Sequence, residues 1–216
     1  MLPQWVSSCR IDDYVVFLDA RRNRYLALGH AAAAPILAGD VAGLSPRIRE
    51  KIRKFGWLAT APQAMPTRVA GPLPVIEPPR RELPVIRAEA VPLSLAARVA
   101  GALVKTRIDL ATRSFQGNLD RVAARNRSTS ASAGPCDMTG TIAAFSRGER
   151  MLAAQTCLLR SLALHRLLAR DGHASTLVFG VKLHPFEAHC WLQHGDAVLN
   201  DTVEQVGLFV PIRSIA

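Results

Sequence analysis

The sequence predicts an α+β protein with a small N-terminal module and a larger C-terminal domain. The N-terminal part alternates short β-branched or aromatic segments with polar turns, whereas the C-terminal part combines helical periodicity with several strand-like segments. Between them, residues 62–92 contain eight of the fourteen prolines of the chain. Because proline cannot continue a helix or a central strand, we expect a semi-rigid, extended linker there. The expected domains are therefore residues 1–61 and 93–216.

The N-terminal module is expected to hold a three-stranded meander followed by two short helices. Asp12-Asp13 and the segment 19–23 are turn signals between the strands. Ser45 is a candidate N-cap, with Pro46 at the first position of the second helix. The expected strands span residues 5–10, 14–18 and 24–28, the first helix spans residues 30–38, and the second begins at residue 46.

Helical and strand-like patterns succeed one another along the C-terminal domain. The segment 94–115 has an apolar face that includes Leu103 and Ile108, which predicts an amphipathic helix. Residues 126–137 are small and polar and predict a flexible loop. The other expected elements are helices over 139–153 and 157–170, strands over 175–183, 188–193 and 197–200, and an edge strand or extended tail near 208–211.

Cys157 is the candidate nucleophile. Apolar residues of the segment 157–170 recur with a period of about 3.6, with Thr156 as an N-cap and Gly172 as a stop signal. Cys157 would then lie in the first turn, where free N–H groups and the positive end of the macrodipole favour a thiolate, the nucleophilic form. A single cysteine on an apolar helix is more often a core residue, so both interpretations stay open. Gln155 is a candidate contributor to an oxyanion hole.

His189 and Asp201 are the candidate base and the carboxylate that orients it. The turn at residues 194–196 joins two strand-like segments, so His189 near the start of one and Asp201 at the end of the next can be cross-strand neighbours. The carboxylate would hold the imidazole tautomer while the other ring nitrogen faces the thiol. Three such residues in one helix–strand–strand unit favour nucleophilic catalysis.

A zinc site in the same region is a competing hypothesis. Zinc requires nitrogen, sulfur or oxygen ligands that converge on one point. Strand residues point alternately to the two faces, so the side chains available here would point apart. We therefore expect no metal. The potential ligands are His184, His189, Cys190, His194 and Asp201.

Composition limits the class of protein further. A hydrophobic content of 49% is ample for a buried core, and no apolar run reaches the length of a membrane span. The N-terminus lacks the basic and apolar regions of a signal peptide. The four cysteines are scattered without a C-x-x-C motif, which favours free thiols in a reducing cytosol over a disulfide framework. We therefore expect a cytoplasmic protein without a membrane span.

The net charge of +10 is unevenly distributed. Residues 80–127 hold ten basic side chains against four acidic ones, whereas residues 128–216 hold seven of each. A basic surface attracts an acidic peptide, an acidic partner or nucleic acid, although a solvated arginine-rich surface explains the excess equally well. The first module offers no clear recognition helix, so nucleic acid is the least expected partner. A non-enzymatic module that binds peptide or nucleic acid remains an alternative.

Three short motifs carry a family resemblance: Cys157-Leu-x-x-Ser-Leu-Ala-Leu, Phe179-Gly-Val and Ala188-His-x-Trp. They resemble the transglutaminase-like cysteine protease of lasso peptide biosynthesis, the maturation B protein, over about residues 145–212. The resemblance implies a transglutaminase/papain-like domain of helices and an antiparallel sheet. It also implies an endopeptidase that removes the leader from a ribosomally made precursor, with Cys157, His189 and Asp201 as the triad.

The same resemblance implies partners. They are a precursor peptide with a threonine before the cleavage site and a lasso cyclase, resembling asparagine synthetase, that closes the ring using ATP. This sequence has no G-x-x-x-x-G-K-[ST] motif, so we expect any ATP requirement through the cyclase and no cofactor on this chain. The main alternative is a transglutaminase-like acyl transferase, because a thioester on Cys157 can pass to an amine. Cys190 departs from the family pattern, in which a small residue such as alanine is more usual.

The N-terminal module resembles a PqqD-like recognition element for ribosomally made, modified peptides (RiPPs), a winged-helix-like fold often fused ahead of the lasso protease. The resemblance rests on the three strands, the short helices and Gly56-Trp57-Leu58. It implies that the leader peptide adds as a strand to the edge of the small sheet. Each implied contact could instead belong to the core of the module. The implied leader-binding residues are Arg24, Tyr25, Leu26 and Leu28 on the strand and Arg49, Ile52, Arg53 and Phe55 on the helix.

Overall fold

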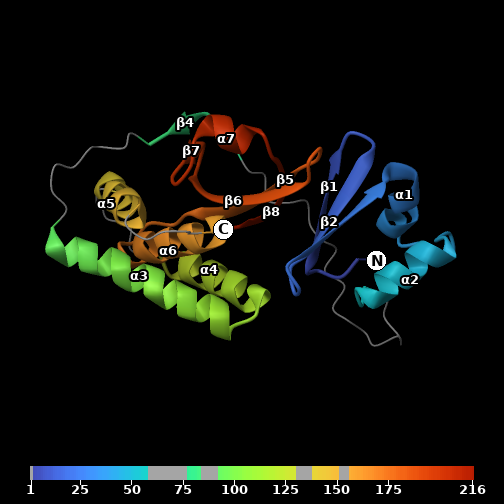
Figure 1. Ribbon diagram of the computed structural model, residues 1–216, viewed down its shortest axis with the longest axis horizontal. Coiled ribbons are helices and arrows are strands. Elements are labelled where there is room, and N and C mark those ends of the chain that lie inside the picture. Colours follow the sequence, from blue (N-terminus) through green and yellow to red (C-terminus); the bar gives the residue numbers. More distant parts are fainter. Residues whose placement is uncertain (1, 58–76, 84–91, 130–137, 151–155) are drawn as a thin grey trace. The chain divides into compact units, whose positions relative to one another are not determined.

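The protein forms two compact units, each with its own sheet, as the computed structural model shows (Figure 1). The units are Met1–Val75 and Ile76–Ala216, so the division falls inside the proline-rich segment. Within the described part of the chain there are seven helices and two sheets, which makes the protein mixed α+β, as predicted. The structure describes residues 2–57, 77–83, 92–129, 138–150 and 156–216.

The first unit is an antiparallel meander followed by two helices, close to the predicted boundaries. Asp12 and Asn23 adopt positive φ in the two turns, which suits their short polar side chains. Pro46 begins the second helix as predicted, but the hydroxyl of Ser45 makes no capping hydrogen bond. The elements are β1 (Val6–Ile11), β2 (Tyr14–Asp19), β3 (Arg24–Gly29), α1 (His30–Ala38) and α2 (Pro46–Lys54).

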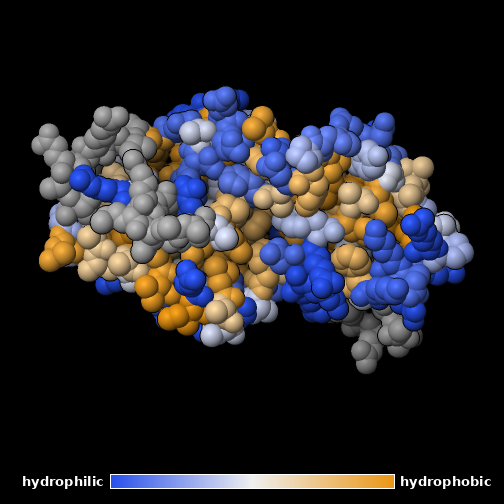
Figure 2. Space-filling model, viewed as in Figure 1, coloured by the Kyte–Doolittle hydropathy of each residue, from blue (hydrophilic) through white to orange (hydrophobic). Residues whose placement is uncertain are grey.

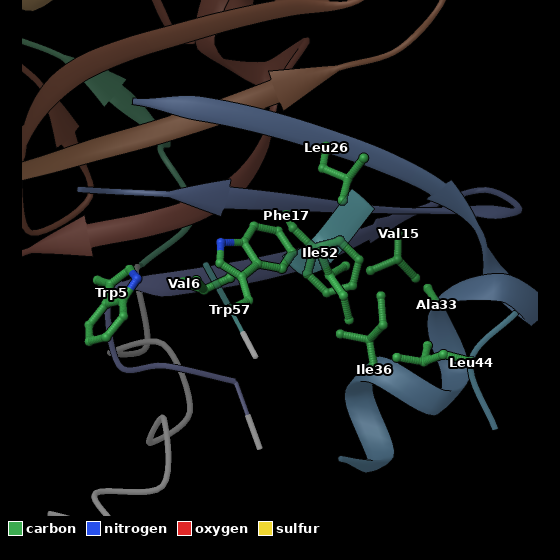
Figure 3. Close-up of a cluster of buried hydrophobic side chains, with 10 residues drawn as sticks. All are labelled: Trp5, Val6, Val15, Phe17, Leu26, Ala33, Ile36, Leu44, Ile52 and Trp57. Carbon is green, nitrogen blue, oxygen red and sulfur yellow. The ribbon is translucent and has the colours of Figure 1, made fainter. Parts of the chain in front are cut away.

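A cluster of aromatic and aliphatic side chains fills the space between this sheet and its helices (Figure 3). Trp57 lies 5.6 Å from the ring of Phe17, and its Nε1 donates to Asp19 Oδ2 at 3.1 Å. Asp19 is fully buried, accepts from the backbone N–H of Arg21 and pairs with Arg22 at 3.3 Å, so its charge is compensated. The segment after α2 is thereby fixed to the end of β2.

The second unit is a five-stranded sheet with a layer of helices on one face (Figure 1). Helix α6 packs on β6, and α3 packs on α6. The strand order is β4-β7-β6-β5-β8. The helices are α3 (Leu93–Thr112), α4 (Phe115–Thr129), α5 (Met138–Arg150), α6 (Cys157–Arg170) and α7 (Val203–Gly207), and the strands are β4 (Arg81–Glu82), β5 (Thr176–Lys182), β6 (Glu187–His194), β7 (Ala197–Val198) and β8 (Val210–Ile215).

Two predictions for the helical layer are wrong. Ile108 is 55% exposed, and Figure 2 shows hydrophobic surface over this helix. The buried residues of α3 are Val99, Ala102, Leu103, Thr106 and Asp109. The segment 126–129 is helical and not part of a loop; residues 130–137 lie outside the described part. Asn126 is buried because its amide donates to the carbonyl of Ser175 at 2.9 Å. Two polar groups that hydrogen-bond to each other can thus be buried together, because neither is left without a partner.

Part of the expected linker joins the second sheet. Arg81 and Glu82 pair in parallel with Ala197 and Val198 at the edge of the sheet. Proline is absent from these two positions although it flanks them, so their N–H groups remain available for pairing. The backbone N–H of Leu83 continues this pairing to the carbonyl of Val198 at 3.4 Å. The prediction of an extended linker over 62–92 is therefore wrong for this edge strand.

The C-terminal segment forms a helix and an edge strand. Thr202 caps α7, accepting from the N–H of Gln205 at 3.1 Å, and this short helix was not predicted. Strand β8 then pairs with β5 at the free edge of the sheet, which agrees with the predicted edge strand. The expected strand 197–200 is shorter than predicted and ends at Val198.

Candidate active site

Cys157 is the first residue of α6, as predicted from the cap and the periodicity. Thr156 Oγ1 accepts from the N–H of Leu159 at 3.3 Å, and Gly172 follows the helix with φ +86°. The sulfur therefore lies at the end of the helix where unpaired N–H groups and the macrodipole favour negative charge. Its side chain is half-buried, so it keeps access to solvent.

The surroundings of Cys157 favour the thiolate strongly. Its pKa is lowered from 9.0 to about 4, first by a hydrogen bond from the Cys190 side chain and then by one from His189. The backbone N–H of Cys190 also donates to the sulfur, and burial opposes these effects. A cysteine with such a pKa carries its nucleophilic form throughout the neutral range.

His189 bridges the sulfur and a carboxylate. Its Nε2 lies 2.5 Å from Asp201 Oδ2, which leaves Nδ1 for the sulfur of Cys157. The hydrogen bond to Asp201 is the largest cause that raises the pKa of His189 from 6.5 to about 9, followed by that to Cys157, against the effect of burial. Between about pH 4 and pH 9 the favoured state is therefore a thiolate–imidazolium pair.

Asp201 remains charged despite being half-buried. Burial is the largest single effect and raises its pKa, but hydrogen bonds from His189 and from the N–H of Thr202 outweigh it. The second of these joins Thr202 N to Asp201 Oδ1 at 2.9 Å. The positive charge of Arg160 contributes in the same direction, so the pKa of Asp201 lies below its ordinary value.

The prediction that Asp201 ends a strand opposite His189 is wrong in detail. The ladder between β6 and β7 pairs only Gln193 with Val198 and His194 with Ala197. Asp201 follows this ladder in a bend, and the bend brings its carboxylate to the imidazole.

A polar network supports that bend, and no sequence motif predicts it. Asn200 Oδ1 accepts from the backbone N–H of Leu192 at 2.8 Å, in place of a backbone carbonyl. Asn200 Nδ2 donates to Ser161 Oγ at 2.9 Å, and Ser161 donates to the carbonyl of Cys190 at 3.3 Å. The network joins α6, β6 and the bend, so the three elements that carry the site are held together.

Aromatic side chains enclose the ring of His189. Trp191 is stacked at 6.1 Å between ring centroids, and Phe209 lies at 5.1 Å. Gly180 on β5 pairs with His189, and a Cβ at Gly180 would lie 2.8 Å from atoms of both Trp191 and Phe209. This glycine therefore allows the two rings to approach the sheet closely.

Cys190 is a second thiol next to the nucleophile. It is 3% exposed, with its sulfur 4.0 Å from Ser161 Oγ. Its interaction with Cys157 is the first cause that raises its pKa, and burial is the second. Cys190 thus remains a thiol and donates a hydrogen bond to the neighbouring thiolate. The departure of Cys190 from the family pattern was visible in the sequence, but its effect on the pKa of Cys157 was not.

Other predicted residues have different outcomes. Gln155 lies outside the described residues. Cys9 is half-buried, and burial raises its pKa to about 11, which disfavours the thiolate. The part of the chain that the structure describes contains no group of three or more His, Cys, Asp or Glu side chains placed to hold a metal ion.

The implied leader-binding residues divide into core and surface. Leu26 and Ile52 are 4% and 3% exposed and belong to the core. Arg49 is engaged with the carbonyl of Leu44 at 3.2 Å, and it also bonds the carbonyl of Ala42. These three side chains therefore stabilise the module itself, and a role for them in leader binding stays a prediction.

The remaining implied contacts lie at the rim of the module. Arg24 is exposed, and Tyr25 and Leu28 are partly buried. Arg53 forms an exposed ion pair with Glu50 at 2.7 Å. Phe55 packs on Trp57 with 5.0 Å between ring centroids. Among the described residues β3 pairs only with β2, which leaves its other edge free.

The helix-borne thiolate, imidazolium and carboxylate define the class of cysteine-dependent hydrolases and acyltransferases. Comparison with protein families agrees with this class, since the sequence model of the transglutaminase-like superfamily matches residues 100–214. The match covers more than half of the chain, and the chain belongs to the transglutaminase-like superfamily, whose members are typically cysteine-dependent enzymes. No curated protein and no solved structure matches the chain.

None of the described helices combines the length and the apolar character that crossing a bilayer requires.

Proposed function

We propose that the protein is a leader peptidase of lasso peptide biosynthesis. It hydrolyses the bond between the leader and the core of a ribosomally made precursor. The observation that carries the proposal is the hydrogen-bonded series from Cys157 through His189 to Asp201 at the tip of α6. The resemblance of the sequence motifs around these residues supports the substrate class, and the superfamily match supports the cysteine chemistry.

The first half of the reaction forms a thioester. The Cys157 thiolate attacks the carbonyl carbon at the leader–core junction, and the electrons of the C=O bond move to oxygen. When this intermediate collapses, the C–N bond breaks and the His189 imidazolium gives its proton to the leaving amine. The core peptide leaves with a free N-terminus, and the leader remains as an acyl group on the sulfur.

The second half returns the enzyme to its starting state. His189, now neutral, takes a proton from a water molecule that attacks the thioester. The C–S bond breaks, the leader leaves with a free carboxylate, and Cys157 is again a thiolate beside an imidazolium. Asp201 keeps Nε2 protonated throughout, so that Nδ1 is the nitrogen that exchanges the proton.

The first unit supplies recognition in this proposal. An extended leader adds to the free edge of β3 through backbone hydrogen bonds, and side-chain contacts fix its register. The side chains proposed to contact it are Arg24, Tyr25 and Leu28 on β3, Arg53 on α2 and Phe55 directly after α2.

The core peptide passes to a lasso cyclase that resembles asparagine synthetase. That partner supplies any ATP-dependent step, and the Cys–His–Asp chemistry itself needs no cofactor. The cytoplasm is the expected compartment, because thiolate chemistry requires reduced cysteine.

Incubation with a leader-bearing precursor, followed by mass spectrometry, tests the proposal. Hydrolysis gives free leader and free core whose masses sum to the precursor plus water. Cys157→Ala should abolish cutting while leaving leader affinity unchanged, because recognition and chemistry lie in different units. Cys9→Ala is the matched control and should cut at the wild-type rate, since its thiol is not activated.

Acyl transfer is the second candidate function, because the superfamily includes both reactions. The same thioester then passes to an amine, and the product gains the mass of the acyl group instead of a water molecule. A mass addition to an added amine, with no free leader acid, would establish transfer and refute the peptidase proposal.

A further inference from the structure

A cavity of about 630 Å³ lies among α3, α4 and α6 in the second unit. Its volume falls within the range of small-molecule sites. All charged side chains among its described lining residues are basic. They are Arg98, Lys105, Arg125, Arg166 and Arg170.

This cavity is separate from the candidate active site. Arg166 lies nine positions after Cys157 on α6, which corresponds to about 13 Å along the helix axis. None of the residues that contact the thiolate lines the cavity. The cations therefore play no part in the chemistry at the sulfur.

Two of the arginines are positioned by carboxylates behind them. Arg98 pairs with Asp171, and Arg166 pairs with Asp109. The Nε atoms of both arginines are nevertheless buried without a hydrogen-bond partner. Both side chains line the cavity, so their guanidinium charges face it from α3 and α6 while the carboxylates hold them in place.

The other three cations have no ion-pair partner among the described residues: Lys105, Arg125 and Arg170. Arg125 is half-buried, and its pKa is lowered to about 10 by burial and then by the nearby charges of Arg166 and Arg121, which outweigh the attraction of Asp109. Crowded cations repel one another, and an anion in the cavity would relieve that repulsion.

The shape of the cavity indicates which anion fits. Small residues of α3 and α6, including Ala97, Gly101, Ala102 and Ala169, leave an apolar floor beside the cations. An extended acidic peptide would place same-face carboxylates about 7 Å apart, so few could enter one cavity. Adjacent phosphate groups concentrate several charges in a small volume, and guanidinium groups bind them in bidentate geometry.

We propose that this cavity binds a small molecule that carries two or more linked phosphate groups. Inorganic polyphosphate and a nucleoside polyphosphate share this chemistry. They differ in whether an organic group occupies the apolar floor. The inference does not depend on the peptidase reaction, and it assigns a second site to the same domain.

Isothermal titration of the full chain with orthophosphate, pyrophosphate, tripolyphosphate and ATP at physiological salt tests this proposal. Affinity should rise with the number of phosphates, and ATP should bind more tightly than tripolyphosphate only if the apolar floor contributes. Cys157→Ala should bind all four as the wild type does, which separates this site from the proposed function.

Two variants locate the site. Arg125→Gln should weaken tripolyphosphate binding about tenfold, and Arg125→Gln with Arg170→Gln about a hundredfold, without a change in thermal midpoint because neither residue has an ion pair to lose. Arg107→Gln is the matched control: it removes an equal charge from an exposed position of α3 outside the cavity and should change the affinity less than twofold.

Three results would overturn the proposal. One is the absence of saturable polyphosphate binding at millimolar concentration. Another is an equal loss of affinity in Arg125→Gln and Arg107→Gln, which would indicate a diffuse charge effect. The third is tighter binding of a glutamate-rich peptide than of tripolyphosphate, which would make the cavity a peptide site.

Discussion

Replacing Asp201 by asparagine tests the electrostatic role of its carboxylate at nearly constant side-chain size. The hydrogen bond from His189 Nε2 to this carboxylate is the largest cause that raises the pKa of His189 from 6.5 to about 9. At about 1.4 kcal/mol for each tenfold change, the whole shift favours the imidazolium by roughly 3 kcal/mol. Since Cys157 contributes part of it, we expect the variant to lose roughly 2 kcal/mol, or about thirtyfold in the imidazolium-to-imidazole ratio.

The pH dependence of alkylation and of peptide hydrolysis reports this change. In the wild type, alkylation of Cys157 by iodoacetamide, followed on its own peptide by mass spectrometry, should rise through about pH 4 as the thiolate forms. Hydrolysis needs both charges, so it should be bell-shaped, with limbs near pH 4 and pH 9. In Asp201→Asn the upper limb should move to lower pH because His189 loses its proton earlier, and the lower limb should move to higher pH because the thiolate loses its cation.

Asp196→Asn is the matched control for this prediction. Asp196 pairs with Arg81 at 2.7 Å in the turn between β6 and β7, away from the sulfur. Its removal should leave both limbs in place. If Asp201→Asn also keeps both limbs at their wild-type positions, the carboxylate does not control the charge of His189 and the assignment of roles is wrong.

Two further substitutions test the surroundings of the pair. Cys190→Ala removes the largest cause of the low pKa of Cys157, so the alkylation limb should move to higher pH. The alkylation rate near pH 5 should fall at least tenfold. A limb that stays at its wild-type pH would contradict the donor role of Cys190. Gly180→Ala places a Cβ 2.8 Å from the ring of Trp191 and should lower the free energy of unfolding by about 1–3 kcal/mol in denaturant titrations, whereas Gly101→Ala, which meets open space within α3, should not destabilise the protein.

Helix α6 could be predicted from the sequence because its signals are local. Thr156, the apolar period and Gly172 lie within one short segment and agree with one another, and the helix begins and ends where they indicate. The position of Cys157 at the helix tip follows directly. The Cys157 thiolate and the His189 imidazolium could therefore be predicted from the sequence once the helix and the neighbouring strand had been predicted.

The route by which Asp201 reaches His189 could not be predicted, because side chains replace backbone pairing there. Alternation suggested a strand through residue 200, but the ladder stops earlier and Asn200 accepts the hydrogen bond of Leu192 with its amide oxygen. Its other partner, Ser161, lies on α6, far away in the sequence. The sequence pattern predicts neither contact, because both depend on the tertiary arrangement.

The prediction of a loop from residue 126, at the end of α4, was wrong for a similar reason. Asn126 and Thr129 resemble loop residues in the sequence, yet both are buried in a helix. Asn126 both donates to and accepts from the backbone of Ser175, and Thr129 donates to the carbonyl of Asn126. A buried polar residue with such partners costs little, so composition alone cannot separate it from a loop residue.

The two ends of α6 suit opposite charges. At its N-terminus the macrodipole and free N–H groups favour the Cys157 thiolate, and at its C-terminus the same dipole favours a cation such as Arg170. Arg166 and Arg170 lie about 13 Å and about 20 Å from Cys157 along the helix axis, both beyond the Debye length of about 8 Å at physiological salt. A polyanion at the basic end would thus change the potential at the sulfur very little. Because the middle of the helix is buried, including Leu164 and Leu168, one rigid element can carry a reactive end and an anion-binding end that work independently.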